Sequence, residues 1–232
     1  MNNEEPLKQV AQRRVKQLEQ EREDFLSWWN DLADHTVPQR YRYNRLESNR
    51  GKIGGNKIVN NTGTRALRTL ASGMMAGVTS PARPWFKLST PSPSMNESHG
   101  VRMWLSEVES LMLEAFSKSN LYNVLPSVYM DMAQFGTASL GEAEDPENIF
   151  WFFTDPIGSY AVASSTRKMI DTWTDTLPWT VEQIVTEFGL SACSEQTQRM
   201  FNDGQRLKEV QVTHLIAPNT GRDPNKLDAI NK

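Results

Sequence analysis

The chain has 232 residues, a net charge of −3 and a hydrophobic content of 38%, enough for one sizeable domain or two small ones. Its single cysteine, Cys193, excludes an internal disulfide and gives no sign of a secreted, disulfide-rich fold. The N-terminus lacks an apolar signal segment, and the most apolar window, residues 67–78, is too short to span a membrane. We therefore expect a globular protein made in a cytosol.

Charge is distributed unevenly along the chain. Residues 35–90 carry ten basic and one acidic side chain, whereas residues 91–163 carry two basic and ten acidic ones. This segregation indicates either a surface that faces a polyanion or two segments that attract each other, within one subunit or between neighbours.

Residues 6–34 predict one long amphipathic helix. Its apolar side chains form a heptad-like seam in which Arg22 fills one place, and the other members are Ala11, Val15, Leu18, Phe25, Trp29 and Leu32. Pro38 lies just beyond the expected end. The seam packs either on the helix's own domain or on a partner subunit.

Residues 39–58 are polar and basic, and they contain three glycines. Alternating tyrosine and arginine side chains can stack on bases and contact phosphates, so the candidate nucleic-acid contacts are Arg40, Arg42, Arg45, Arg50 and Lys52. A solvated loop or an edge strand is the alternative. The stretch KIGGNK lacks the pattern of a phosphate-binding loop.

Three further helices are predicted at residues 61–78, 98–118 and 121–135. In the first, Leu67, Leu70, Met74 and Val78 form an apolar stripe. Gly73 and Gly77 belong to a second face of small residues, and each glycine costs about 1 kcal/mol relative to alanine inside a helix. We therefore expect these two glycines either to permit a close helix contact or to let the helix ends bend.

Prolines and glycines mark where these helices end. Pro81 and Pro84 stop the first of them, Pro126 predicts a kink or a start in the last, and Gly136 predicts its end. Between the prolines, Arg83 offers a rigid hydrogen-bond donor. Trp85 and Phe86 are expected to anchor the segment in the core, with Trp85 buried.

After residue 136 the pattern changes to short β-prone runs, which predict an antiparallel meander. The runs are TASLGEA, NIFWFFTD, GSYAVAS and MIDTWTDT, and EVQVTHLIAP follows later. Between them, TVEQIVTEFG predicts a short helix with Thr180 as N-cap, Gln183 completing a capping box and Gly189 at the stop. A second small helix is expected around residues 194–202.

The predicted fold class is therefore α+β. A helical N-terminal half, made of the long amphipathic helix and three further helices, precedes a short-stranded antiparallel β region with one or two small helices. The expected parts are residues 1–58, the long helix and basic loop; residues 59–140, the other helices; and residues 141–232, the β-rich part.

The sequence carries little catalytic chemistry. The histidines are more than 60 residues apart, and neither Ser80 nor Cys193 has the surroundings of a nucleophile. Four carboxylates in one turn could hold a divalent cation or form a solvated loop: Glu142, Glu144, Asp145 and Glu147. We predict no enzyme, no metal site and no cofactor.

The stretch LASGMMAGVTSPARPWFKL resembles the signature of the head-to-tail connector, or portal, proteins of short-tailed bacteriophages. Collinear similarity includes FLSWWNDLADHTVP, NLYNVLPSVYMDMAQFGTASL, PIGSYAVASS and DTWTDTLPWTVEQIVTEFG. The motif residues that this resemblance marks as structural are Gly73, Met74, Gly77, Ser80, Pro81, Arg83, Pro84, Trp85, Phe86, Phe135 and Gly136. Thr174 and Asp175 stand where the family is expected to carry an arginine.

The resemblance implies a structural subunit, without catalysis, of a ring at one capsid vertex, usually of twelve copies. Double-stranded DNA is packaged and ejected through such a ring. The implied partners are capsid protein, terminase and tail or adaptor proteins, in the virion and, during assembly, in the host cytoplasm, with no membrane. Because family members are considerably longer, the chain is expected to be the N-terminal, wing-like portion, ending before the stem and clip. The alternative is a nucleic-acid-binding module that uses the basic residues 40–45.

Overall fold

The computed structural model describes residues 7–41 and 57–218, which fold into two compact units. The first unit includes residues 7–30 and 158–218, and the second includes residues 31–41 and 57–157. This division differs from the three consecutive parts expected from the sequence, because each unit joins segments that are distant along the chain.

The first unit contains most of helix α1 (Leu7–His35). The predicted seam is confirmed at its centre, where Leu18 is fully buried and Arg22 fills the missing place. The Arg22 guanidinium donates a hydrogen bond of 2.5 Å to the carbonyl oxygen of Tyr160. Phe25 lies outside the seam and is half-exposed. The seam therefore packs on the helix's own unit, and a buried arginine belongs to it.

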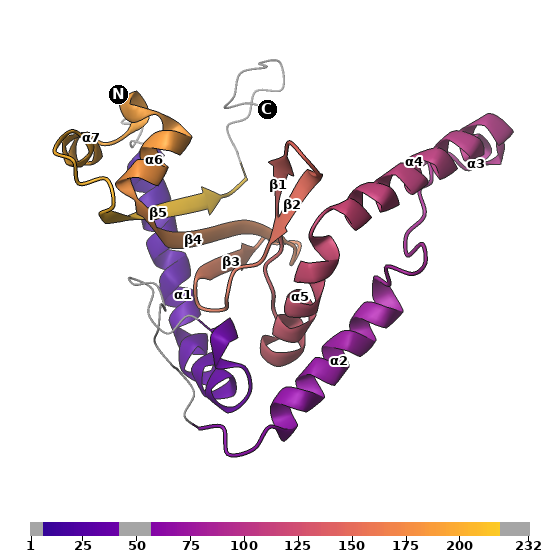
Figure 1. Ribbon diagram of the computed structural model, residues 1–232, viewed down its shortest axis with the longest axis horizontal. Helices are drawn as coiled ribbons and strands as arrows, with labels where there is room; N and C mark the ends of the chain where they lie inside the picture. The colour runs from indigo at the N-terminus through magenta and orange to yellow at the C-terminus, as the bar shows by residue number, and fades with distance from the viewer. Residues whose placement is uncertain (1–6, 42–56, 219–232) are drawn as a thin grey trace. The chain divides into compact units, whose positions relative to one another are not determined.

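The first unit also contains a three-stranded antiparallel sheet in the order β3-β4-β5 (Figure 1). Its strands are β3 (Tyr160–Ser164), β4 (Ile170–Thr180) and β5 (Glu209–Ile216). β3 pairs only with the first half of β4. Pro178 lies in the second half, where β5 is the one described strand that pairs with β4. A strand edge tolerates the missing N–H of proline.

Two small helices of the first unit follow β4. They are α6 (Val181–Phe188) and α7 (Glu195–Asn202), with a 3-10 turn, η2 (Leu190–Ala192), between them. Both hydrogen bonds of the predicted capping box are present: the Gln183 N–H donates to Thr180 Oγ1 at 3.2 Å, and the Thr180 N–H donates to Gln183 Oε1 at 2.8 Å. Gly189 ends α6 with a φ of 78°.

The second unit is mostly helical. Its elements are η1 (Pro38–Arg40), α2 (Thr62–Val78), α3 (Pro93–Glu97), α4 (His99–Lys118), α5 (Leu121–Phe135), β1 (Gly141–Asp145) and β2 (Ile149–Phe153). α2 lies beside α5, and the antiparallel β1–β2 hairpin completes the cluster (Figure 1). The buried core consists of Ala71, Leu121, Leu125, Tyr129 and Phe152.

These elements confirm the α+β class and correct three details. The short helix α3 was not predicted, although Ser92 followed by Pro93 is a typical helix start. α5 begins at Leu121 and continues through Pro126, so it does not start at the proline. The strands form two separate antiparallel sheets, one in each unit, instead of a single meander.

The face that α2 buries also differs from the prediction. Leu67 and Ala71 are buried, whereas Leu70 is 52% and Val78 is 58% exposed. A Cβ atom built on Gly73 or Gly77 meets no atom within 4 Å. Within the described residues, the expected close helix contact at these glycines is therefore wrong. Ala71 was missed because its small side chain adds little to a hydropathy stripe.

Among the described residues, no helix has both the length and the apolar character that a bilayer crossing requires.

Replacing Gly77 or Gly136 by alanine should change the stability of the chain in opposite directions. Gly77→Ala should stabilise the chain by about 1 kcal/mol, because its helical position is open. Gly136→Ala should destabilise it by about 1–2 kcal/mol, because Gly136 ends α5 with a left-handed φ of 75°. Urea unfolding of the two variants beside the natural chain measures both changes. A loss of stability in Gly77→Ala would show a close contact within the chain.

Candidate functional site

The corner that follows α2 contains most of the motif residues singled out in the sequence. Thr79 is the C-cap of α2, and its buried hydroxyl forms a 2.8 Å hydrogen bond with the hydroxyl of Tyr129 on α5. Ser80 turns the chain, and its Oγ accepts a weak 3.4 Å hydrogen bond from the Ala82 N–H. The Ser80 hydroxyl thus has a role in the turn.

Arg83 folds back on the helix it follows. Its guanidinium donates to the carbonyl oxygens of Ala76 and Gly77 at 3.3 and 3.2 Å. These carbonyls lie in the last turn of α2, where acceptors have no partner within the helix and a positive charge is favourable. Arg83 therefore stabilises the C-terminus of α2 and remains exposed, as do Pro81 and Pro84 on either side of it.

Trp85 and Phe86 enter an aromatic cluster of the second unit. Trp85 stacks on Phe116 with ring centroids 6.1 Å apart, and its indole N–H donates to the hydroxyl of Tyr122 at 3.1 Å. Phe86 meets Trp85 edge-on at 4.9 Å. Both side chains are half-buried, so the expected anchoring is present while the full burial expected for Trp85 is not. The cluster continues through Phe116 to Phe150 and Phe152 on β2.

Three other motif residues lie outside this corner. Met74 packs against the core from α2, half-buried. Phe135 is buried at the end of α5, and Gly136 then donates its N–H to the Met132 carbonyl at 3.1 Å. The motif residues therefore belong to one unit, but Phe135 and Gly136 lie at the end of α5 opposite to the Trp85–Tyr122 contact. Gly73 and Gly77 differ from the other members, because they face open space within the described residues.

A buried ion pair, which the sequence did not reveal, holds the other side of this unit. Asp131 on α5 has an exposed fraction of 0%, and Arg40 clasps it with Nε at 3.0 Å from one carboxylate oxygen and Nη2 on the other. Arg40 Nη2 also donates to Thr154 Oγ1 at 3.1 Å. Such a two-pronged arrangement is the strongest form of an arginine–carboxylate pair.

This arrangement gives Arg40 a structural role in place of the nucleic-acid contact expected for it. Its side chain is only 18% exposed, and its donors are directed at Asp131 and Thr154. The other basic candidates, Arg42, Arg45, Arg50 and Lys52, lie outside the described residues.

The pKa of Asp131 reflects two opposing influences. Burial raises it above the ordinary aspartate value, while the hydrogen bonds and the charge of Arg40 act in the opposite direction. An acidic residue within the apolar stripe of α5 was the signal available in the sequence. Its partner could not be found that way, because Arg40 lies 91 residues earlier.

Asn120 forms a second link that sequence reasoning missed. Its side-chain amide donates to the Phe152 carbonyl at 2.7 Å and accepts from the Phe152 N–H at 2.8 Å. The amide thus pairs with β2 as a neighbouring strand would, and it ties the start of α5 to the hairpin. Nothing in the spacing of Asn120 indicated this contact.

The described part of the chain holds no group of three or more histidine, cysteine or carboxylate side chains placed to bind a metal ion. The acidic turn is instead organised by Asp145. This carboxylate accepts from the Glu147 N–H and from the Asn148 amide, both at 3.0 Å. These bonds lower the pKa of Asp145, and the Glu147 bond has the larger effect.

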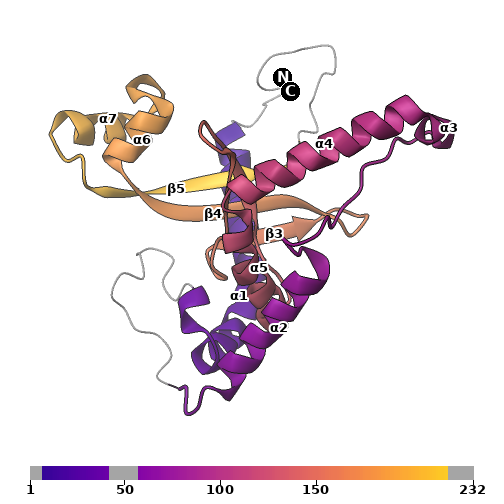
Figure 2. The same cartoon turned by 45° about the vertical axis from the view of Figure 1, so that its right-hand side comes forward.

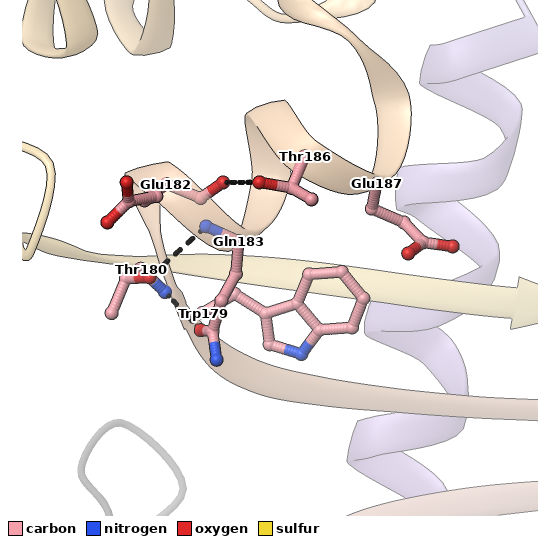
Figure 3. Close-up of a pocket in the computed structure, with 6 residues that line it drawn as sticks. All are labelled: Trp179, Thr180, Glu182, Gln183, Thr186 and Glu187. Atoms are coloured by element: carbon pink, nitrogen blue, oxygen red, sulfur yellow. Dashed lines mark hydrogen bonds between the residues drawn. The ribbon is translucent and has the colours of Figure 1, made fainter.

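A shallow pocket in the first unit is formed at the start of α6 (Figure 3). It is lined by Trp179, Thr180, Glu182, Gln183, Thr186 and Glu187. Its hydrogen-bonding groups serve the helix itself, through the Thr180–Gln183 capping box and the 2.8 Å bond from the Thr186 hydroxyl to the Glu182 carbonyl. The lining combines a capped helix start with an aromatic wall, without a nucleophile and base in contact.

The buried pair gives a testable energetic signature. Arg40→Met should destabilise the chain by about 3–5 kcal/mol, because it leaves the Asp131 carboxylate buried without its partner. The double variant Arg40→Met/Asp131→Leu should recover most of that loss. Lys118→Met, which breaks the exposed pair with Glu114, is the matched control and should have a much smaller effect. Urea unfolding of the four proteins would contradict the prediction if the double variant were the least stable.

Stability should also depend on pH through Asp131. Because burial raises its pKa, the folded chain keeps a proton on this carboxyl at pH values where the unfolded chain has lost it. The contribution of Asp131 to stability should therefore fall as the pH rises from about 4, the ordinary aspartate value, through the folded pKa. The difference in unfolding free energy between the natural chain and Asp131→Asn isolates this effect. A difference that grows with pH would mean that Arg40 outweighs burial.

Comparison with known proteins places nearly the whole chain in one family. The family model for the bacteriophage head to tail connecting protein matches residues 8–232. The portal protein of Salmonella phage epsilon15 is 43% identical over 226 residues, which cover 97% of this chain and 40% of that protein. The probable portal protein of Bordetella phage BPP-1 is 43% identical over 212 residues, covering 91% of this chain and 38% of that protein.

This chain spans about 40% of the length of these relatives. The matched region includes the corner after α2, the buried pair and the sheet of the first unit. The resemblance noted in the sequence is thereby confirmed, and the chain belongs to the bacteriophage head to tail connecting protein family.

Proposed function

We propose that this chain forms part of the structural subunit of a phage portal, the ring that joins head and tail. The observation that carries the proposal is the family match over residues 8–232, together with 43% identity to two proteins named as portal or probable portal proteins. A family defined by connecting head to tail is structural, and the motif residues Trp85, Phe86 and Phe135 of this chain pack in the second unit.

We infer the finer role from the resemblance to portal proteins. The subunits form a closed ring, of twelve copies in the complete assembly, at one vertex of the capsid. Double-stranded DNA enters and leaves through this ring, and the chain itself performs no catalysis. The partners are capsid protein, terminase and tail or adaptor proteins, and assembly takes place in the host cytoplasm.

Within that subunit, we assign this chain to the outer, wing-like portion. The support is its α+β architecture and its share of about 40% of the relatives' length. The tunnel-lining and terminase-docking parts then belong to the remaining length of those relatives. The pairing of Arg40 with Asp131 removes one donor from the alternative role, in which basic residues 40–45 bind nucleic acid.

The proposal predicts where the chain is found in phage particles. Antibodies raised against it should label virions at a single vertex, where head and tail meet. Negative-stain microscopy of the purified chain should show ring-shaped oligomers, and native mass spectrometry gives their number of copies. Labelling spread over the whole capsid, or absent from virions, would contradict the portal assignment.

A further inference from the structure

Helix α4 carries an apolar ridge that no described residue covers. Met103, Trp104 and Leu111 are each about 60% exposed, and they recur at helical spacing with Glu107 and Glu114. We call these five residues the α4 ridge. Only Leu105 and Ala115 of the helix are buried. Both views of the second unit show α4 extending away from α5 toward α3 (Figures 1 and 2).

Solvent-exposed aromatic and aliphatic side chains in a row indicate a surface that another protein covers. The ridge has a defined charge as well as an apolar character. Glu107 forms no ion pair within the described residues, and Glu114 pairs only with Lys118 on its own helix. A partner surface should therefore be positive at its edges and able to admit large side chains.

The outer side of α2 has these properties. Ala66, Leu70, Gly73 and Gly77 recur at spacings of four, three and four residues, and all are exposed. Arg65 borders this stripe near its start, and the Arg83 guanidinium reaches the carbonyls at its end. We call these six residues the α2 face. Neither arginine forms an ion pair within the described residues.

The dimensions of the two surfaces also agree. On α4, Trp104 and Leu111 lie seven residues apart, about 10.5 Å along a helix. On α2, the same distance separates Ala66 from Gly73 and Leu70 from Gly77. Because a Cβ at either glycine would meet nothing within 4 Å, both positions have room for a large side chain from outside. These glycines cost helix stability, and no contact within the described residues accounts for them.

We propose that the α4 ridge of one copy of this chain docks on the α2 face of the next copy. The two surfaces are different parts of the same unit, so the contact is head-to-tail and can repeat around a closed ring. This inference rests on the proposed ring function and names the helices that join its subunits. It also gives the segregated charge of residues 35–90 and 91–163 a use between neighbours.

Site-directed cross-linking tests the contact directly. In a Cys193→Ser background, a Trp104→Cys chain is mixed with a Gly73→Cys chain and oxidised under mild conditions. The expected product is a disulfide-linked heterodimer, formed in clear excess over each homodimer. In the control mixture, Ser72→Cys replaces Gly73→Cys and lies about 100° round the helix from it. Equal cross-linking in both mixtures, or none, would overturn the proposal.

A second measurement separates docking from folding. Gly73→Gln should keep or raise the melting temperature of the chain, because glutamine favours a helix more than glycine does, yet it should weaken self-association at least tenfold by sedimentation. Trp104→Ala should weaken association similarly, whereas Leu207→Ala, at an exposed leucine of the first unit, should not. Unchanged association in both Gly73→Gln and Trp104→Ala would refute this interface.

The outcomes distinguish the interface from the ring. If the Gly73→Gln chain still forms rings, and the Trp104→Cys and Gly73→Cys chains do not cross-link, these helices are rejected as the contact. The proposed portal function would then still stand. The specific cross-link without a closed ring would support the interface and reject ring formation by this chain alone.

Discussion

The buried ion pair between Arg40 and Asp131 is the constraint on which the second unit depends. It joins η1, the middle of α5 and the segment after β2, three pieces that are far apart in the chain. Asp131 is fully buried, so any rearrangement that removed Arg40 would leave a carboxylate in an apolar core. This cost favours one relative placement of the three segments, while the aromatic cluster supplies much of the apolar burial.

The pair works together with smaller polar contacts in the same unit. Ile157 donates its N–H to the Arg40 carbonyl at 3.1 Å. The backbone and the side chain of Arg40 therefore both form hydrogen bonds with other segments. The Asn120 amide fixes β2 from the other side. These contacts hold the β1–β2 hairpin on the helices, which matters because an isolated two-stranded hairpin is marginal in water. They therefore tie the hairpin to η1 and to the start of α5.

Local signals were predictable from the sequence, and contacts across the chain were not. Thr180 and Gln183 lie three residues apart, and Gly136 must adopt a conformation that glycine favours, so both helix boundaries followed from neighbouring residues. Asp131 and Arg40 are separated by 91 residues, and no local pattern connects them. The buried face of α2 was misjudged because hydropathy ranks Leu70 above Ala71, whereas packing against α5 selects the small side chain. Familiar motifs, read together along the chain, identified the family where residue chemistry could not.

The position of Pro178 in β4 has a consequence for crowded copies of this chain. The half of β4 that contains it pairs with β5 on one side only, which leaves an edge that could recruit a strand from a neighbour. Proline offers no N–H to such a strand, so that edge resists the irregular sheet growth that leads to aggregates. In the ring that we propose, where copies of the chain are held close together, Pro178 would block this competing mode of association.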